Sequence, residues 1–154
     1  MHNLKVGVIG TSKKIDERRL PIHPKHLSRI PKELREQLIF EKGYGAPFGI
    51  SDEEIASLSG GIDTRHNLLA NIGAVIINKP VLSDLEELKI GGTLWGYVHC
   101  VQQQAITQAA LDRKLTLIAF EACLYDHHRE MWAVILFIKT MKWLVIVRCC
   151  MHCN

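Results

Sequence analysis

The sequence of 154 residues predicts an α/β domain built on a parallel sheet. Short apolar runs alternate along the chain with segments of helical periodicity, as parallel strands do with crossover helices. The runs are nearly continuous in apolar residues, which is typical of strands covered on both faces. The composition, 47% hydrophobic and 23% charged, is that of an ordinary globular chain.

Five strands are expected, each a short run rich in β-branched or aromatic residues. They cover residues 4–10, 37–45, 73–80, 91–99 and 115–122. The first two runs contain or lead into glycine, and the next two end in a positively charged or titratable side chain.

Helices are expected between these strands. Apolar residues recur at helical spacing from Leu27 to Leu38, but Pro31 interrupts them, so the first helix should be broken into two short pieces. Two capping-box patterns, Ser51 with Glu54 and Ser83 with Glu86, each mark the start of a short helix. Further helices are expected over residues 63–71 and 102–114.

This order of elements predicts a flavodoxin- or Rossmann-like domain without a dinucleotide fingerprint. The glycines of "GVIG" (7–10) follow the first strand, but the G-x-G-x-x-G pattern is missing. We therefore assign no cofactor-binding residue and no metal ligand in this chain.

Charge and hydropathy exclude two classes of partner. The net charge of +3 is too small to indicate nucleic-acid binding. No apolar run approaches the roughly 20 residues that span a membrane, and "MHNLKVGVIG" lacks the layout of a signal peptide. The sequence predicts a cytoplasmic protein that binds neither nucleic acid nor membrane.

Three side chains follow the carboxyl ends of predicted strands, where such sheets bind ligands. Arg19, preceded by Arg18, follows the first strand, Lys79 ends the third and His99 ends the fourth. Arginine offers a planar fork to a carboxylate, lysine polarises a carbonyl oxygen, and histidine moves a proton near neutral pH. The three predict a site for a small anion. A solvated arginine pair, a surface lysine and a structural histidine are the alternatives.

The order of several motifs resembles a known family. These are "ERRLPIHP", "EKGYGAPFGISDEEI", "VIINKP", "GTLWGYVH" and "TLIAFEA". Together, over residues 4–124, they resemble the amino-terminal domain shared by alanine dehydrogenase and the proton-translocating pyridine nucleotide transhydrogenases. Within that family the chain is most similar to (carboxyethyl)ornithine synthase, of the opine-forming branch, and to lysine–ketoglutarate reductase.

The resemblance implies roles for the same three residues. Arg19 would bind the substrate carboxylate, Lys79 would bind substrate and act near its keto or amino group, and His99 would act as catalytic acid and base. The family often reads lysine-glutamate-proline where Lys79 directly precedes Pro80, and a gapless alignment would put Asn78 at the lysine position.

The implied function is the substrate-binding half of an amino-acid or opine dehydrogenase, which reductively aminates a 2-keto acid. NAD(H) or NADP(H) would bind a second, Rossmann-type domain absent from this chain, so we expect the chain alone to be inactive. The alternative is a non-enzymatic module for a small carboxylate, or a subunit of a split enzyme or transhydrogenase. Expected partners are a small keto acid or amino acid, and either a second copy or a separately encoded Rossmann subunit.

The last residues differ from the rest of the chain. Residues 128–154 carry a net charge of +3, which leaves the remainder neutral, and three of the five cysteines lie within the last six residues. We therefore expect a family domain over residues 1–124 and an atypical tail over 125–154. The tail is interpreted as a docking element, as a metal site at "CCMHC", or as the product of a shifted reading frame. We favour the third, because suitable codons read one base later encode a phrase similar to the family's link into its second domain.

Overall fold

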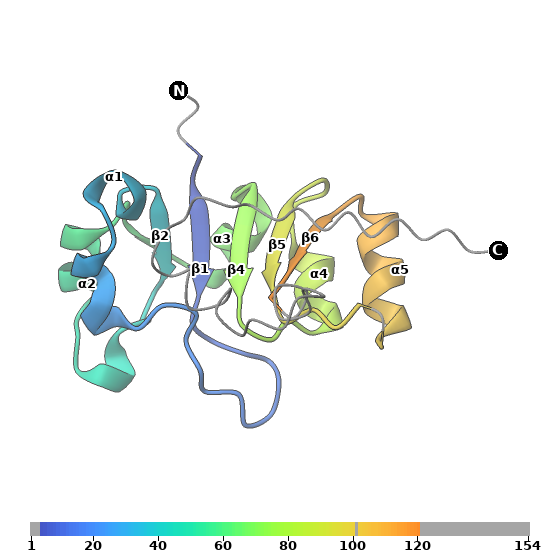
Figure 1. Cartoon of the computed structure of the whole chain (residues 1–154), viewed down its shortest axis with the longest axis horizontal. Helices are drawn as coiled ribbons and strands as arrows, with labels where there is room; N and C mark the ends of the chain where they lie inside the picture. The colour runs from blue at the N-terminus through green and yellow to red at the C-terminus, as the bar shows by residue number, and fades with distance from the viewer. Residues whose placement is uncertain (1–3, 101, 121–154) are drawn as a thin grey trace, which may run out of the picture.

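A six-stranded, fully parallel sheet forms the centre of the computed structural model, which describes residues 4–100 and 102–120 (Figure 1). The order across the sheet is β3-β2-β1-β4-β5-β6. The strands are β1 (Val6–Ile9), β2 (Leu38–Glu41), β3 (Ile62–Asp63), β4 (Ala74–Ile77), β5 (Thr93–Gly96) and β6 (Thr116–Ala119). The predicted α/β class and Rossmann-like arrangement are therefore confirmed.

Helical segments connect the strands and cover both faces of the sheet. They are the 3-10 helices η1 (Pro24–Arg29) and η2 (Ala46–Phe48), and the α-helices α1 (Lys32–Arg35), α2 (Asp52–Leu58), α3 (Arg65–Asn71), α4 (Leu82–Glu87) and α5 (Gln104–Asp112). One core cluster joins α3, α4 and α5 to the sheet through side chains such as Leu68, Leu85 and Ile106. The other places Leu27 and Ile55, of η1 and α2, against β1 and β2. Within the described residues, none of these helices is long and apolar enough to cross a membrane.

The expected break at Pro31 is present, since Pro31 lies between η1 and α1. The capping box at Ser51 is present too: its hydroxyl accepts from the Glu54 N–H, and the Glu54 carboxylate accepts from the Ser51 N–H. Both features could be predicted because each depends on residues close together in the sequence.

Two local expectations were wrong, and the first of them changes the expected five strands to six in the described part of the chain. Asp63 was expected in a helix, but it belongs to the edge strand β3, and α3 begins after the Thr64 cap. The helix expected to start at Ser83 begins at Leu82 instead, because the Asp84 carboxylate accepts from the Val81 N–H and fixes the helix start there.

The strand order reverses between β1 and β4, and this switch point is where open α/β sheets bind ligands. A loop of residues 10–23, called here the β1 loop, leaves the end of β1 and extends beyond the sheet (Figure 1). The segment after β4 begins beside it with Asn78 and Lys79.

A buried carboxylate fixes the start of the β1 loop. Glu41, at the end of β2, accepts hydrogen bonds from the backbone N–H groups of Gly10 and Thr11, both at 2.7 Å, and from the Thr11 hydroxyl at 2.6 Å. Arg65 of α3 donates to the Thr11 carbonyl at 2.8 Å and lies 3.9 Å from the Glu41 carboxylate. The loop therefore begins in one defined direction.

Arg65 also pairs with Asp84, a fully buried residue of α4. The Arg65 Nη2 donates to Asp84 at 2.7 Å, and Lys13 of the β1 loop lies 3.4 Å from the same oxygen. Glu41, Arg65 and Asp84 form what we call the root network, because it ties the start of the loop to β2, α3 and α4.

The other end of the loop is also held from the β2 side. The Tyr44 hydroxyl accepts from the Ile22 N–H at 3.0 Å and donates to the Ile22 carbonyl at 2.7 Å. Burial raises the pKa of Tyr44, so this hydroxyl keeps its proton. A Cβ on Gly10 would overlap the Tyr44 ring, so glycine is required there. Residues 12–21 project between two fixed points.

Replacing Arg65 with methionine should lower the free energy of unfolding by about 3–5 kcal/mol, because the buried carboxylates of Glu41 and Asp84 lose the guanidinium that they share. Urea denaturation followed by circular dichroism measures the loss. The matched control is Lys32→Met, which breaks the exposed pair with Glu36 and should cost less than about 1 kcal/mol. A similar small loss in both variants would contradict the role of the root network.

Replacing Gly96 with alanine should destabilise the fold by about 3 kcal/mol or more, because the new Cβ would overlap the Ile77 carbonyl oxygen on the adjacent strand. Gly73→Ala is the control: a Cβ there meets no atom within 4 Å. It should be neutral or slightly stabilising. Thermal melts of the two variants decide the matter, and equal melting temperatures would show that β5 can shift away from β4.

Candidate functional site

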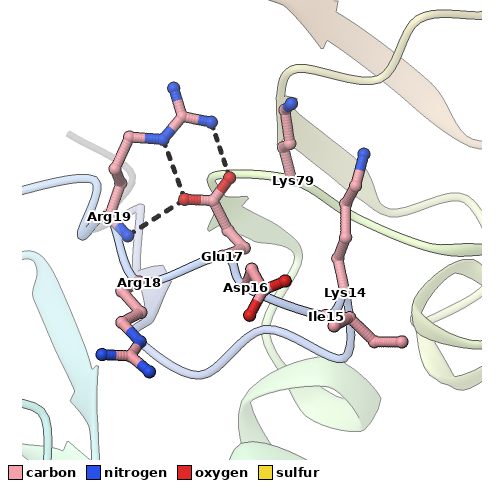
Figure 2. Close-up of a pocket in the computed structure, with 7 residues that line it drawn as sticks. All are labelled: Lys14, Ile15, Asp16, Glu17, Arg18, Arg19 and Lys79. Carbon is pink, nitrogen blue, oxygen red and sulfur yellow. Dashed lines mark hydrogen bonds and ion pairs between the residues drawn. The ribbon is translucent and has the colours of Figure 1, made fainter.

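A pocket of about 510 Å³ lies at the switch point, between the β1 loop and the segment after β4. This volume is within the usual range for small-molecule sites. Its lining is mostly charged and consists of Lys14, Ile15, Asp16, Glu17, Arg18, Arg19 and Lys79 (Figure 2). Two of the three predicted site residues, Arg19 and Lys79, therefore line the same pocket.

Arg19 is held by Glu17. The Arg19 Nε donates to Glu17 Oε1 at 2.8 Å and its Nη2 donates to Oε2 at 2.6 Å, which makes a two-pronged ion pair (Figure 2). The Arg19 backbone N–H also donates to Glu17 Oε1, at 3.0 Å. Asp16 precedes the pair in the left-handed conformation, with a φ of 64°, and so turns the chain before it.

The charge state of this pair is defined. The hydrogen bond from Arg19 lowers the pKa of Glu17 to about 2, against the desolvation that opposes it. Glu17 is therefore ionised throughout the neutral range. The same bond raises the pKa of Arg19, so the guanidinium stays charged.

Lys79 and Asn78 occupy different places beside this pair. Lys79 lines the pocket and its positive charge also lowers the pKa of Glu17. Asn78, the residue that a gapless alignment would put at the lysine position, points its Nδ2 toward the Glu17 carboxylate at 3.4 Å. Its carbonyl accepts from the Tyr97 N–H at 2.9 Å and so ties the ends of β4 and β5 together.

His99 is not among the side chains that line this pocket. Its ring stacks against Tyr97, with centroids 6.3 Å apart, and the Arg19 guanidinium carbon lies 5.9 Å from the centroid of the same Tyr97 ring. Tyr97 therefore contacts both His99 and Arg19. The backbone at His99 has a φ of 47°, and its carbonyl accepts the N–H groups of Gln102 and Gln103 just before α5.

Sequence reasoning missed Glu17, Tyr97 and Glu41. Glu17 stands two residues before Arg19, and this spacing was an available signal for a local ion pair. Tyr97 stands two residues before His99 in a strand-like run, where alternate side chains share a face. Glu41 ends an apolar strand, but its partners at Gly10 and Thr11 are 31 and 30 residues distant, and nothing in the sequence joins them.

The described residues do not fit a dinucleotide at the end of β1. In nucleotide-binding sheets, the backbone N–H groups after the first strand receive the phosphates. Here the N–H groups of Gly10 and Thr11 already donate to the Glu41 carboxylate, whose negative charge would repel a phosphate. The segment that follows is the long β1 loop and not the start of a helix.

Comparison with solved structures places the fold among those of two oxidoreductases. A structure titled "L-alanine dehydrogenase" superposes with a TM-score of 0.67 and 19% identity, covering 87% of this chain and 36% of that one. The transhydrogenase from Sinorhizobium meliloti superposes with a TM-score of 0.64 and 15% identity, covering 79% of this chain and 36% of that one. At these identities the comparison concerns the fold.

Sequence comparison extends the likeness. An alanine dehydrogenase from Methanococcus maripaludis is 30% identical over 118 residues, which are 74% of this chain and 31% of the relative. The chain thus spans about a third of the length of the curated relatives it matches.

The family described as "Alanine dehydrogenase/PNT, N-terminal domain" matches residues 8–136. The expected boundary at 124 and the tail 125–154 lie outside the residues that the structure describes. The match covers most of the sequence, and the chain belongs to this family of alanine dehydrogenase and PNT N-terminal domains.

Proposed function

We propose that this domain binds the carboxylate of a 2-oxo acid, or of the corresponding amino acid, as the substrate-binding half of an amino-acid or opine dehydrogenase. The observation that supports this most is the meeting of Arg19 and Lys79, from the loops after β1 and β4, in one pocket at the switch point. Alanine dehydrogenases among the relatives supply the reaction class, a reversible reductive amination.

Each proposed role follows from the chemistry of the side chain. Arg19 binds the substrate carboxylate with its free N–H groups. Lys79 places a positive charge beside the 2-oxo oxygen, which favours attack by ammonia or an amine at the carbonyl carbon. His99, next to the Tyr97 ring, carries the proton that leaves with water as the imine forms.

The nicotinamide coenzyme, NAD(H) or NADP(H), would supply the hydride for the reduction. Because Glu41 occupies the N–H groups at the end of β1, we assign the coenzyme to a separate Rossmann-type domain or subunit. A separately encoded Rossmann subunit would then be the partner that brings the coenzyme, and a second copy of this chain is the other proposed partner. The cytoplasmic location stays a prediction.

The occupied N–H groups at the end of β1 also support a second candidate function. A domain that holds a small carboxylate but no nucleotide can act as a binding module without catalysis, or as one subunit of a split enzyme. Pyruvate is the first ligand to test because the curated relatives are alanine dehydrogenases. Lysine with 2-oxoglutarate tests the opine and lysine–ketoglutarate branch.

Pyruvate should bind at millimolar concentration, and Arg19→Ala should weaken it by about tenfold or more, the cost of losing charge-assisted hydrogen bonds. NMR chemical-shift titration measures both affinities. The matched control is Arg18→Ala, which removes the same charge from the neighbouring residue, whose side chain extends away from Arg19 and Lys79 (Figure 2). We expect less than about a threefold effect there, because exposed charges are screened. Equal losses of pyruvate affinity in both variants would mean that general electrostatic attraction, and not a specific contact with Arg19, binds the ligand.

The 154-residue chain incubated with NADH, ammonium and pyruvate should show no NADH oxidation above a heat-treated control. The reason is the occupied N–H pair at the end of β1, together with the lack of a glycine fingerprint in the sequence. Absorbance at the NADH band is the measurement. Turnover by the chain alone would overturn this part of the proposal. Turnover that begins on adding a nucleotide-binding subunit would favour the split enzyme over the binding module.

A further inference from the structure

Glu17 places a negative charge inside a pocket that we propose for an anion. Figure 2 shows Arg19 on one side of the Glu17 carboxylate and Lys79 on the other. The position that a bound carboxylate would seek is thus partly taken by the protein's own carboxylate. This arrangement needs an explanation beyond attraction between a ligand and two cations.

Burial differs sharply between the two partners. The Glu17 side chain is 6% exposed, whereas the Arg19 side chain is 60% exposed. The carboxylate is therefore the fixed member of the pair, and the guanidinium reaches outward from it. Asn78 contributes to this fixing with its Nδ2 at 3.4 Å from Glu17 Oε1.

The ion pair decides which edge of the guanidinium a ligand can use. A guanidinium has two edges that grip a carboxylate, one formed by Nε and Nη2 and the other by Nη1 and Nη2. Glu17 occupies the first edge. The Tyr97 ring lies 5.9 Å from the guanidinium carbon and limits movement toward β5. The Nη1 nitrogen points away from Glu17 in Figure 2. Within the described residues, the side-chain hydrogen bonds of Arg19 come from Nε and Nη2, and the side chain is 60% exposed, so Nη1 remains available to a ligand.

We propose that Glu17 is a positioning residue of the carboxylate site, which holds the Arg19 guanidinium so that its Nη1–Nη2 edge receives the carboxylate of a 2-oxo acid. The proposal rests on the proposed function. Its energetic basis is preorganisation. An exposed arginine loses side-chain conformational entropy when it binds a ligand, and the ion pair with Glu17 orders the Arg19 side chain before the ligand binds.

A simple repulsion by Glu17 leads to the opposite expectation. If Glu17 only added negative charge, replacing it with glutamine would strengthen anion binding. If Glu17 positions Arg19, the same change weakens binding although the pocket becomes more positive. Within the described residues, the charged groups that line the pocket with Glu17 and Arg19 are Lys14, Asp16 and Arg18 on the loop and Lys79 after β4, and Tyr97 contacts Arg19.

The first experiment measures pyruvate affinity by NMR titration in the wild type, Glu17→Gln, Arg19→Ala and the double variant. Glu17→Gln should weaken pyruvate binding by about three- to tenfold, because the Arg19 guanidinium would no longer be held in place by a charge-assisted hydrogen bond. The double variant should bind pyruvate better than Arg19→Ala, because an unpaired Glu17 would otherwise neutralise Lys79. Glu36→Gln is the control, since it removes the same charge from an exposed pair outside the pocket, and it should leave the affinity unchanged.

The second experiment needs no ligand. The carboxyl carbon shift of Glu17 is followed from neutral pH downward. In the wild type it should stay flat through pH 4.5, the midpoint of an ordinary glutamate, because the pKa of Glu17 is about 2. In Arg19→Ala the midpoint should rise toward 4.5, because the side-chain hydrogen bond from Arg19, the largest cause of the lowered pKa, is lost while desolvation remains.

The outcomes separate the two proposals. Tighter or unchanged pyruvate binding in Glu17→Gln, or an ordinary Glu17 midpoint in the wild type, would overturn the positioning role while the proposed function stands. Failure of the wild type to bind pyruvate or 2-oxoglutarate would count against the proposed function. The pairing of Glu17 with Arg19 would then be decided by the carboxyl titration alone.

Discussion

The geometry of the site depends on the hydrogen bonds that Glu41 accepts at the end of β1. Two backbone N–H groups and one hydroxyl converge on this carboxylate within 2.7 Å, and Arg65 brings the positive charge that makes its burial tolerable. A buried carboxylate without such partners would take up a proton or destabilise the fold. Because Arg65 also holds Asp84, the ends of β1 and β2 and the starts of α3 and α4 share one arrangement of charges.

The β1 loop combines a rigid attachment with an exposed, charged middle. Glu41 and Tyr44 follow each other within four residues, yet one holds Gly10 and the other holds Ile22. The side chains between these points are mostly exposed, and Ile15 is 86% exposed. The Glu17 side chain is enclosed, and its ion pair with Arg19 provides a contact within this stretch. Rigid ends with a charged, accessible centre suit a loop that must present cations without burying them.

Local chemistry explains which parts of the fold could be predicted. The strands were found as apolar runs, and Pro31 and Ser51 marked helix boundaries, because all of these depend on neighbours within a few residues. The edge strand β3 has two residues, too few for any periodicity, and its start is set by pairing with Phe40. The side chain that caps the start of α4 is Asp84 and not the expected Ser83, because Arg65, 19 residues earlier, pairs with the buried Asp84 carboxylate.

The candidate site follows the same division. Arg19 and Lys79 could be placed together because parallel strands bring their carboxyl ends to one edge of the sheet. Tyr97 and the edge of Arg19 that Glu17 occupies could not, since they depend on side-chain directions that no spacing rule gives. The roles of Arg19, Lys79 and His99 stay predictions. The tail over 125–154 lies outside the described residues.

Glu41 also limits how this sheet can be redesigned or can diverge. Introducing a glycine-rich turn after β1 would not suffice to make a nucleotide site, because the carboxylate would still occupy the N–H groups that a phosphate needs. Removing the carboxylate would leave Arg65 with Asp84 as its remaining acidic partner within the root network and would release the start of the loop that carries Arg19. In this domain, gaining a nucleotide site is therefore opposed to keeping the site that contains Arg19. A change of specificity toward nucleotides would have to rebuild β2, α3 and α4 together.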